Sequence, residues 1–251
     1  MKKKITIFND KKTWKYIIII SVLFTITELT WYDSIGRIGS GKTSLLNLPL
    51  ESVLIIIFAW FVLGERLRQF QIIGATIAII GFTISASSDT NLKTLPEFGI
   101  GEMETVIASL SGAIAITLIA KLLVKQDVVQ VTAFTLLISG IMLNIIHWLW
   151  YGPIIVDLSD WFYLWMFAFV PFLVFLLYYV SIKRIGTSIT SIITSTSIVL
   201  TVAVQLILSI QTNIPVNPPD NVILAFVGGG ISVCGIYMIF SGAKNEKTKK
   251  S

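Results

Sequence analysis

Two carboxyl groups in strongly apolar surroundings are the residues of this chain best suited to chemistry. Glu28 and Glu51 each interrupt a long apolar segment, and a carboxyl group inside a bilayer is costly and therefore a candidate functional residue by default. At 1.5 Å per residue, Glu28 lies about 18 Å along its helix and Glu51 about 10 Å along the next, antiparallel one, so both reach a similar depth in a core of about 30 Å. The pair could share a proton, which suits proton-coupled exchange; alternatively, both are neutral, hydrogen-bonded packing groups.

Other polar side chains have the spacing of helical stripes. Asn47 and Ser44 share a face with Glu51, and Tyr32 and Thr25 share one with Glu28. A further stripe consists of hydroxyl residues: Thr190, Thr194, Ser197 and Thr201. These residues could line a path for a solute or protons, or they could hydrogen-bond between helices. The sequence leaves both interpretations open.

The segment Gly36–Thr43 reads GRIGSGKT and fits the phosphate-binding pattern GxxxxGK[ST] at every position. A working loop of this kind needs a preceding β-strand and a following soluble helix that together hold the phosphates. Both flanks here are apolar segments of membrane length, so we interpret the segment as a turn between two helices. ATP is therefore not expected as a ligand.

Metal and cofactor chemistry have little support in the sequence. His147 is the one histidine and Cys234 the one cysteine, and no carboxylate cluster accompanies either. No nucleophile–base pair is apparent. We therefore predict no metal, no cofactor and no enzymatic activity.

The composition is typical of a membrane protein. Of 251 residues, 55% are apolar and only 13% charged, whereas about one-quarter of an average soluble domain is charged. Because a helix of about 20 apolar residues spans a bilayer, hydropathy predicts an all-α membrane protein with about eight transmembrane helices. Their ranges are 16–36, 44–63, 70–86, 105–125, 128–150, 162–182, 189–209 and 222–241.

The basic residues sort to one side of these helices. With a cytoplasmic N-terminus, 16 of the 19 lie inside, and only Arg37, Lys42 and Lys93 lie outside. This asymmetry predicts a multi-pass protein of the cell (plasma) membrane with both termini cytoplasmic. It also explains the net charge of +5, so nucleic acid is not an expected partner.

An internal repeat connects the two halves of the chain. Residues 32–46 read YDSIGRIGSGKTSLL and residues 179–193 read YVSIKRIGTSITSII, with eight of fifteen positions identical. Five predicted crossings separate the copies, so they point in opposite directions across the membrane. Such inverted-topology repeats are typical of secondary transporters.

The sequence resembles the drug/metabolite transporter superfamily, of the EamA type, and does so most strongly in residues 48–82. Pro49 lies early in a helix that ends in Leu63-Gly64-Glu65-Arg66, and the next helix carries Gly74 and Gly81. We interpret Glu65 and Arg66 as part of a salt bridge, at the helix end or at the membrane interface, that fixes the hairpin between this helix and the next. The glycine pair, and its counterpart Gly228 and Gly235, should allow close helix packing within the bundle or at a homodimer seam.

The resemblance implies ten helices in two five-helix repeats, with the transport path between them. With about eight predicted helices instead of ten, we expect the first two to be missing from this sequence and the first unit of the inverted repeat to be incomplete. The second repeat also departs from the signature, since Gln211 and Thr212 stand where Gly64 and Glu65 map. The predicted organisation is a basic cytoplasmic N-terminus (1–15), a three-helix partial repeat (16–86), an outer loop (87–104), a five-helix repeat (105–241) and a basic cytoplasmic tail (242–251).

Two functions remain open. The first is a secondary transporter, an exporter or exchanger of a small organic metabolite that works by alternating access. A homodimer could then supply the wall that the missing helices leave open. The second is a membrane partner or assembly subunit, derived from a truncated transporter, that does not itself transport. Membrane lipid is a partner in either case.

Overall fold

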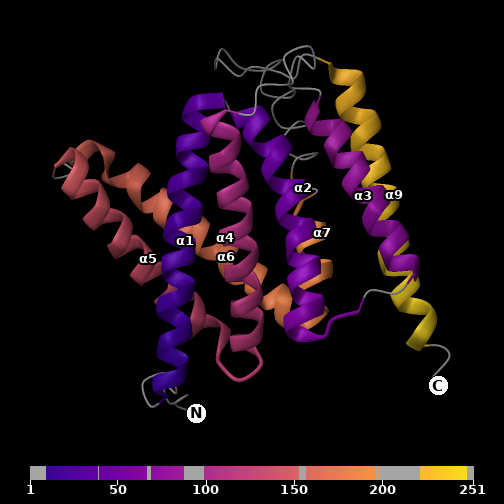
Figure 1. Ribbon diagram of the computed structural model, residues 1–251, viewed down its shortest axis with the longest axis horizontal. Helices are drawn as coiled ribbons and strands as arrows, with labels where there is room; N and C mark the ends of the chain where they lie inside the picture. The colour runs from indigo at the N-terminus through magenta and orange to yellow at the C-terminus, as the bar shows by residue number, and fades with distance from the viewer. Residues whose placement is uncertain are drawn as a thin grey trace.

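The computed structural model describes residues 10–38, 40–66, 69–87, 99–152, 157–195, 197 and 221–247. In these ranges every regular element is a helix and no strand occurs, which confirms the predicted all-α fold class (Figure 1). The elements are α1 (Lys11–Ile38), α2 (Ser40–Phe58), the π-helix η2 (Ala59–Leu63), α3 (Gln69–Ser87), α4 (Ile100–Leu123), α5 (Val128–Tyr151), the 3₁₀ turn η4 (Leu158–Asp160), α6 (Trp161–Ile185), α7 (Thr187–Ser195) and α9 (Val222–Lys247).

Each apolar segment predicted from hydropathy overlaps one of these α-helices, although residues 198–209 of the seventh lie outside the described ranges. Five described stretches are long and apolar enough to cross a membrane. Shorter apolar stretches lie in α3 (Gln69–Gly81) and α9 (Phe226–Gly235). The five long stretches are Lys11–Ile38, Leu46–Leu63, Ile100–Leu123, Val128–Trp150 and Trp161–Ile185.

Helix α4 is the centre of the bundle and packs against both α1 and α2. Small residues make this possible, because their short side chains let the neighbouring backbones approach closely. On α4, Ala108, Ser109, Gly112 and Ala115 are all buried. The hydrophobic core extends from this contact to the start of α5 and the end of α6, where the ring of Tyr179 is fully enclosed.

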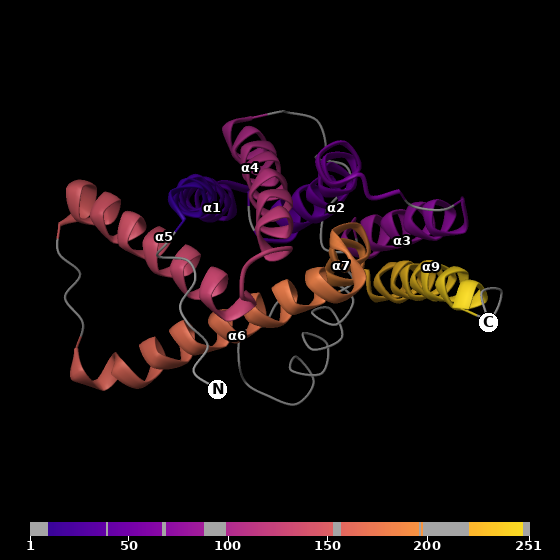
Figure 2. The same cartoon turned by 90° about the horizontal axis from the view of Figure 1, so that it is seen from below.

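The α3 and α9 helices form a close pair on one side of the bundle (Figures 1 and 2). A Cβ atom on Gly81 would overlap Ser232 of α9, and one on Gly235 would overlap Ala78 of α3. The Ser232 hydroxyl donates a hydrogen bond to the Ala78 carbonyl oxygen at 3.2 Å. Of the two roles that the sequence left open for the glycine faces, the structure shows packing within one chain.

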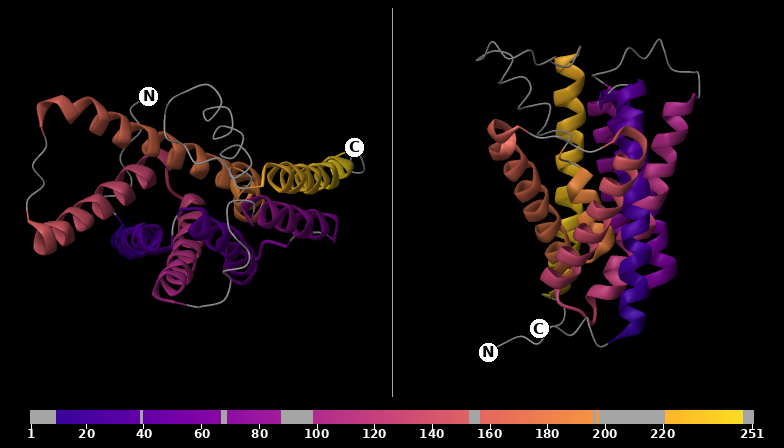
Figure 3. Two further views of the ribbon diagram at one scale, coloured as in Figure 1. Left: turned by 90° about the horizontal axis from the view of Figure 1, so that it is seen from above. Right: turned by 90° about the vertical axis from the view of Figure 1, so that its left-hand side faces the viewer.

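The α5 and α6 helices leave the bundle on the other side. They meet where α5 begins and α6 ends, and they diverge toward the segment that connects them (Figure 2 and Figure 3, left). Pro171 lies within α6, where proline removes one backbone hydrogen bond. Because α5 and α6 diverge, much of the apolar surface of α6 is exposed, with Trp165 at 69% and Phe169 at 58%.

Candidate functional site

Glu51 of α2 reaches the middle of α4 at a glycine. A Cβ atom built on Gly112 would lie 2.7 Å from Oε1 of Glu51 and 3.4 Å from Cγ2 of Thr27 on α1. Any larger residue at position 112 would therefore displace the carboxyl group. The Thr27 and Ser111 hydroxyls share a hydrogen bond of 2.8 Å beside it, so α1, α2 and α4 converge at this point.

Glu28 follows Thr27 on α1 but lines a cleft between α1, α4 and α5. The cleft has a volume of about 740 Å³ and lies along the part of α1 that is remote from the N-terminus. Its lining residues are Ile26, Glu28, Leu29, Thr30, Tyr32, Asp33, Arg37, Glu104, Leu143, Ile146, His147 and Trp150. The structure thus places Tyr32, which was predicted from the sequence, beside Glu28 in one cavity.

The two carboxyl groups belong to neighbouring parts of the bundle, since Glu28 follows Thr27 on α1 and Glu51 meets Thr27 at Gly112. Tyr178 of α6 packs against the hydrophobic core that contains Ile55 of α2 and Ala113 of α4, so a helix of the second half of the chain also reaches this region. Among the described residues, neither Glu28 nor Glu51 has a hydrogen-bond partner, and both are partly buried. A change in the protonation of either carboxyl group would therefore break no side-chain hydrogen bond among the described residues.

The other predicted path residues lie in different surroundings. Asn47 is buried between α2 and α4, where its amide donates to the Ser109 hydroxyl at 3.0 Å. It joins two helices and does not line the cleft. On α7, Thr194 donates to the backbone of Thr190 at 2.8 Å and is exposed. Ser197, beyond the end of α7, is exposed as well. The structure therefore does not gather these residues around Glu28.

The phosphate-loop-like segment is mostly helical. The α1 helix continues to Ile38 and α2 begins at Ser40. The hydroxyl of Thr43 is buried and shares a hydrogen bond of 3.0 Å with Ser34, which in turn bonds Thr105 of α4 at 2.6 Å. The threonine that would bind a nucleotide-bound metal in a phosphate loop is here used to join three helices.

Glu65 performs a structural role that the sequence only partly indicated. Gly64 adopts a left-handed conformation (φ 69°) and ends η2, which directs Glu65 to the start of α7. Its Oε1 accepts a hydrogen bond from the Thr187 amide at 2.9 Å. Its Oε2 accepts from the Ser188 amide at 3.0 Å and from the Ser188 hydroxyl at 2.9 Å. Glu65 thus caps a helix more than 120 residues away, instead of pairing with a cation in the described part of the chain.

The ionisation of Glu65 reflects this capping. Burial raises the pKa of its carboxyl group, but the hydrogen bonds from Thr187 and Ser188 outweigh that effect, so the pKa lies below its ordinary value. The carboxylate also lies at the positive end of the α7 dipole, which favours the charged form. Gly186 ends α6 with φ 92° and leaves room for the carboxylate, whose nearest atom is 3.5 Å from a Cβ built there.

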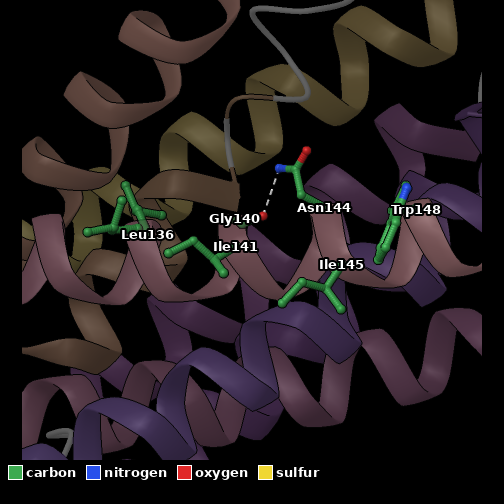
Figure 4. Close-up of a pocket in the computed structure, with 7 residues that line it drawn as sticks. Leu136, Gly140, Ile141, Asn144, Ile145 and Trp148 are labelled. Atoms are coloured by element: carbon green, nitrogen blue, oxygen red, sulfur yellow. Dashed lines mark hydrogen bonds between the residues drawn. The ribbon is translucent and has the colours of Figure 1, made fainter. Parts of the chain in front are cut away.

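A second, more apolar cavity of about 660 Å³ runs along one face of α5 (Figure 4). All of its described lining residues come from that helix, among them Leu136, Ile141, Ile145 and Trp148. The Asn144 amide donates to the Gly140 carbonyl oxygen at 2.9 Å within the helix. This face carries no ionisable group in the described residues and so lacks the chemistry of the Glu28 cleft.

Comparison with known proteins identifies the family. The model of the EamA-like transporter family matches residues 1–87 and 99–241. The chain belongs to the EamA-like transporter family. It is accordingly a multi-pass membrane protein of a family that transports small solutes, and the resemblance seen in the Leu63–Arg66 signature is confirmed.

A solved structure supports the fold of this EamA-like protein. A crystal structure titled only "Crystal structure of protein" aligns with a TM-score of 0.74 over 93% of this chain and 77% of the other, at 14% identity. At that identity the likeness shows the fold alone. No curated protein matches the chain.

Several residues of the site were missed by sequence reasoning. Gly112, Tyr178 and Glu104 come from helices far from Glu28 and Glu51 in the chain, and nothing in their local pattern points to those partners. The one usable signal was the run of small residues around Gly112, which is typical of a close helix contact. In the described residues no group of three or more potential metal ligands occurs.

Proposed function

We propose that this EamA-like protein is a secondary transporter, an exporter or exchanger, that moves a small organic metabolite across the cytoplasmic membrane by alternating access. The observation that carries the proposal is the convergence of Glu51, Gly112 and Thr27 beside the Glu28 cleft. Both termini are cytoplasmic in this proposal, because that orientation places most basic residues inside.

The proposed mechanism couples solute to protons. Glu28 faces the cleft, where solute can reach it, and Glu51 lies behind it against α4. Two nearby carboxyl groups resist simultaneous ionisation. A proton held by the pair when the cleft is empty would leave when a solute binds there, so the two ligands would alternate at one site.

The proposed moving parts are the two inverted halves of the chain, α1–α3 and α4–α9. They share the α3–α9, α1–α4 and α2–α4 contacts, and Glu65 joins the first half to the start of α7. A change in the relative position of the halves would expose the region where Glu51, Thr27 and Gly112 meet alternately to each side of the membrane.

The test measures uptake into proteoliposomes. The full chain is reconstituted, a pH gradient is imposed, and uptake of a panel of labelled amines, amino acids and nucleosides is followed with and without the gradient. We expect gradient-driven uptake that falls at least about tenfold in Glu28→Gln and in Glu51→Gln, since a general acid–base group contributes about a hundredfold or more to proton transfer steps.

The matched control is Asp160→Asn, which removes an exposed carboxylate outside the cleft and should leave uptake unchanged. If both glutamine variants keep wild-type gradient dependence, the proton-coupled mechanism is wrong.

A further inference from the structure

We infer that the cleft beside Glu28 takes its solute as an organic cation, an amine attached to an apolar or aromatic group. The inference rests on the proposed transport function and adds the chemical class of the solute. The cleft volume of about 740 Å³ lies within the range of about 300–1,000 Å³ that is usual for small-molecule sites.

The charges in this cleft do not balance. Arg37 is shared between two carboxylates, with 3.2 Å from Nη2 to Oδ2 of Asp33 and 3.1 Å from Nε to Oε2 of Glu104. Glu28 is the third carboxylate, and no described cation pairs with it. With His147 neutral, three carboxylates against one guanidinium leave the cleft negative even when Glu28 is protonated, so it attracts cations and repels anions.

The remaining walls suit the other end of such a solute. The rings of Tyr32 and Trp150 are 63% and 73% exposed, and aromatic faces attract ammonium groups that come within about 6 Å. Aliphatic side chains complete the cleft: Ile26, Leu29, Leu143 and Ile146. Carboxylates, aromatic rings and aliphatic groups in one cavity match an amphipathic amine better than a sugar or an organic acid.

Glu28 occupies the position that such a cation would seek. It is one turn of α1 before Tyr32, and both residues line the cleft. Asp33 and Glu104 already hold Arg37, so Glu28 is the carboxylate whose charge an incoming ammonium group would neutralise. The same residue would therefore serve solute and proton in turn.

The test compares ligands that differ mainly in charge. Tryptamine is a cation, indole-3-propionate an anion and indole-3-propionamide a neutral molecule, all with the same ring. Binding to the full chain in detergent is measured by calorimetry at neutral pH. We expect tryptamine to bind at least about tenfold more tightly than indole-3-propionate, a preference of about 1.4 kcal/mol, with the amide between them.

Variants assign the preference to the cleft. Glu28→Gln and Glu104→Gln should each reduce tryptamine affinity several-fold. Asp157→Asn removes an exposed carboxylate that does not line the cleft, and it should change nothing. Since Glu104 lies near the start of α4, its variant remains informative if Glu28→Gln does not fold.

Two outcomes would overturn the inference: indole-3-propionate binding as tightly as tryptamine, or an equal loss of affinity in Asp157→Asn. Failure of the transport proposal gives a different result. Selective tryptamine binding without gradient-driven uptake of any solute would contradict the transport proposal and support a cleft that selects organic cations. Gradient-driven uptake of anions or neutral solutes alone would support the transport proposal and contradict the preference for organic cations.

Discussion

Replacing Gly235 with alanine is expected to separate α3 from α9 and to leave little folded protein. The new methyl group would overlap the backbone nitrogen of Ala78 and lie 2.9 Å from its Cα. Backbone atoms inside a helix cannot yield unless the whole helix moves. Overpacking costs typically about 1–3 kcal/mol where side chains can adjust, and here they cannot. Size-exclusion profile and melting temperature in detergent measure the effect.

Gly230→Ala is the matched control for this substitution. Gly230 lies on the same helix, but no heavy atom lies within 4 Å of a Cβ built there. Alanine favours a helix over glycine by up to about 1 kcal/mol, so this variant should be as stable as the wild type or slightly more so. Equal melting temperatures for the two variants would show that the α3–α9 contact does not hold the fold.

Replacing Glu65 with glutamine is expected to destabilise the start of α7. The amide of glutamine has one oxygen instead of two, so it cannot accept from both Thr187 and Ser188 as the carboxylate does. A lost helix cap costs about 0.5–2 kcal/mol. The melting temperature in detergent should fall, and the end of α6 should become more accessible to protease.

The pH dependence of the Glu65 effect has a defined sign. The pKa of Glu65 is lower in the folded protein than its ordinary value of about 4.5, so the carboxylate contributes fully above that pH and loses its contribution as the pH falls through the folded pKa. The difference in melting temperature between wild type and Glu65→Gln should therefore be constant near neutral pH and shrink in acid below about 4.5.

A capping residue of another helix provides the control. Asp127 accepts a hydrogen bond from the Val129 amide at 3.0 Å at the start of its own helix, α5. Because asparagine caps helices about as well as aspartate, Asp127→Asn should change stability little. A drop in Asp127→Asn as large as that in Glu65→Gln would contradict a special role for the long-range cap.

Part of the site could be predicted from sequence because it depends on local chemistry. Glu28 and Glu51 are conspicuous as carboxyl groups in apolar segments, whatever surrounds them. The close approach of Glu51 to Gly112 could not be predicted, since it depends on which face of α2 meets α4. For the same reason Glu65 was noticed as part of a motif, while its bonds to α7 were not foreseen.

The internal repeat shows most directly that tertiary contacts give identical residues different environments. Tyr32 and Tyr179 are equivalent in the repeat, yet the first is 63% exposed in the cleft and the second is fully buried. Ser34 and Ser181 are equivalent as well. Ser34 is buried because α4 covers it and Thr105 bonds it, whereas Ser181 is partly exposed and bonds its own helix. The neighbours of the two copies differ, and so do their environments.

The sequence by itself determined that the chain is an all-α membrane bundle and where its apolar segments lie. It also identified Glu28 and Glu51 as carboxyl groups whose burial in apolar segments costs free energy. These properties follow from the transfer free energy of each segment and from local helix geometry. Only the tertiary structure decided that α3 pairs with α9, that Glu28 shares a cleft with Arg37 and Trp150, and that Glu65 caps α7. Those contacts join residues far apart in the chain, and they depend on how closely small side chains let particular helices approach.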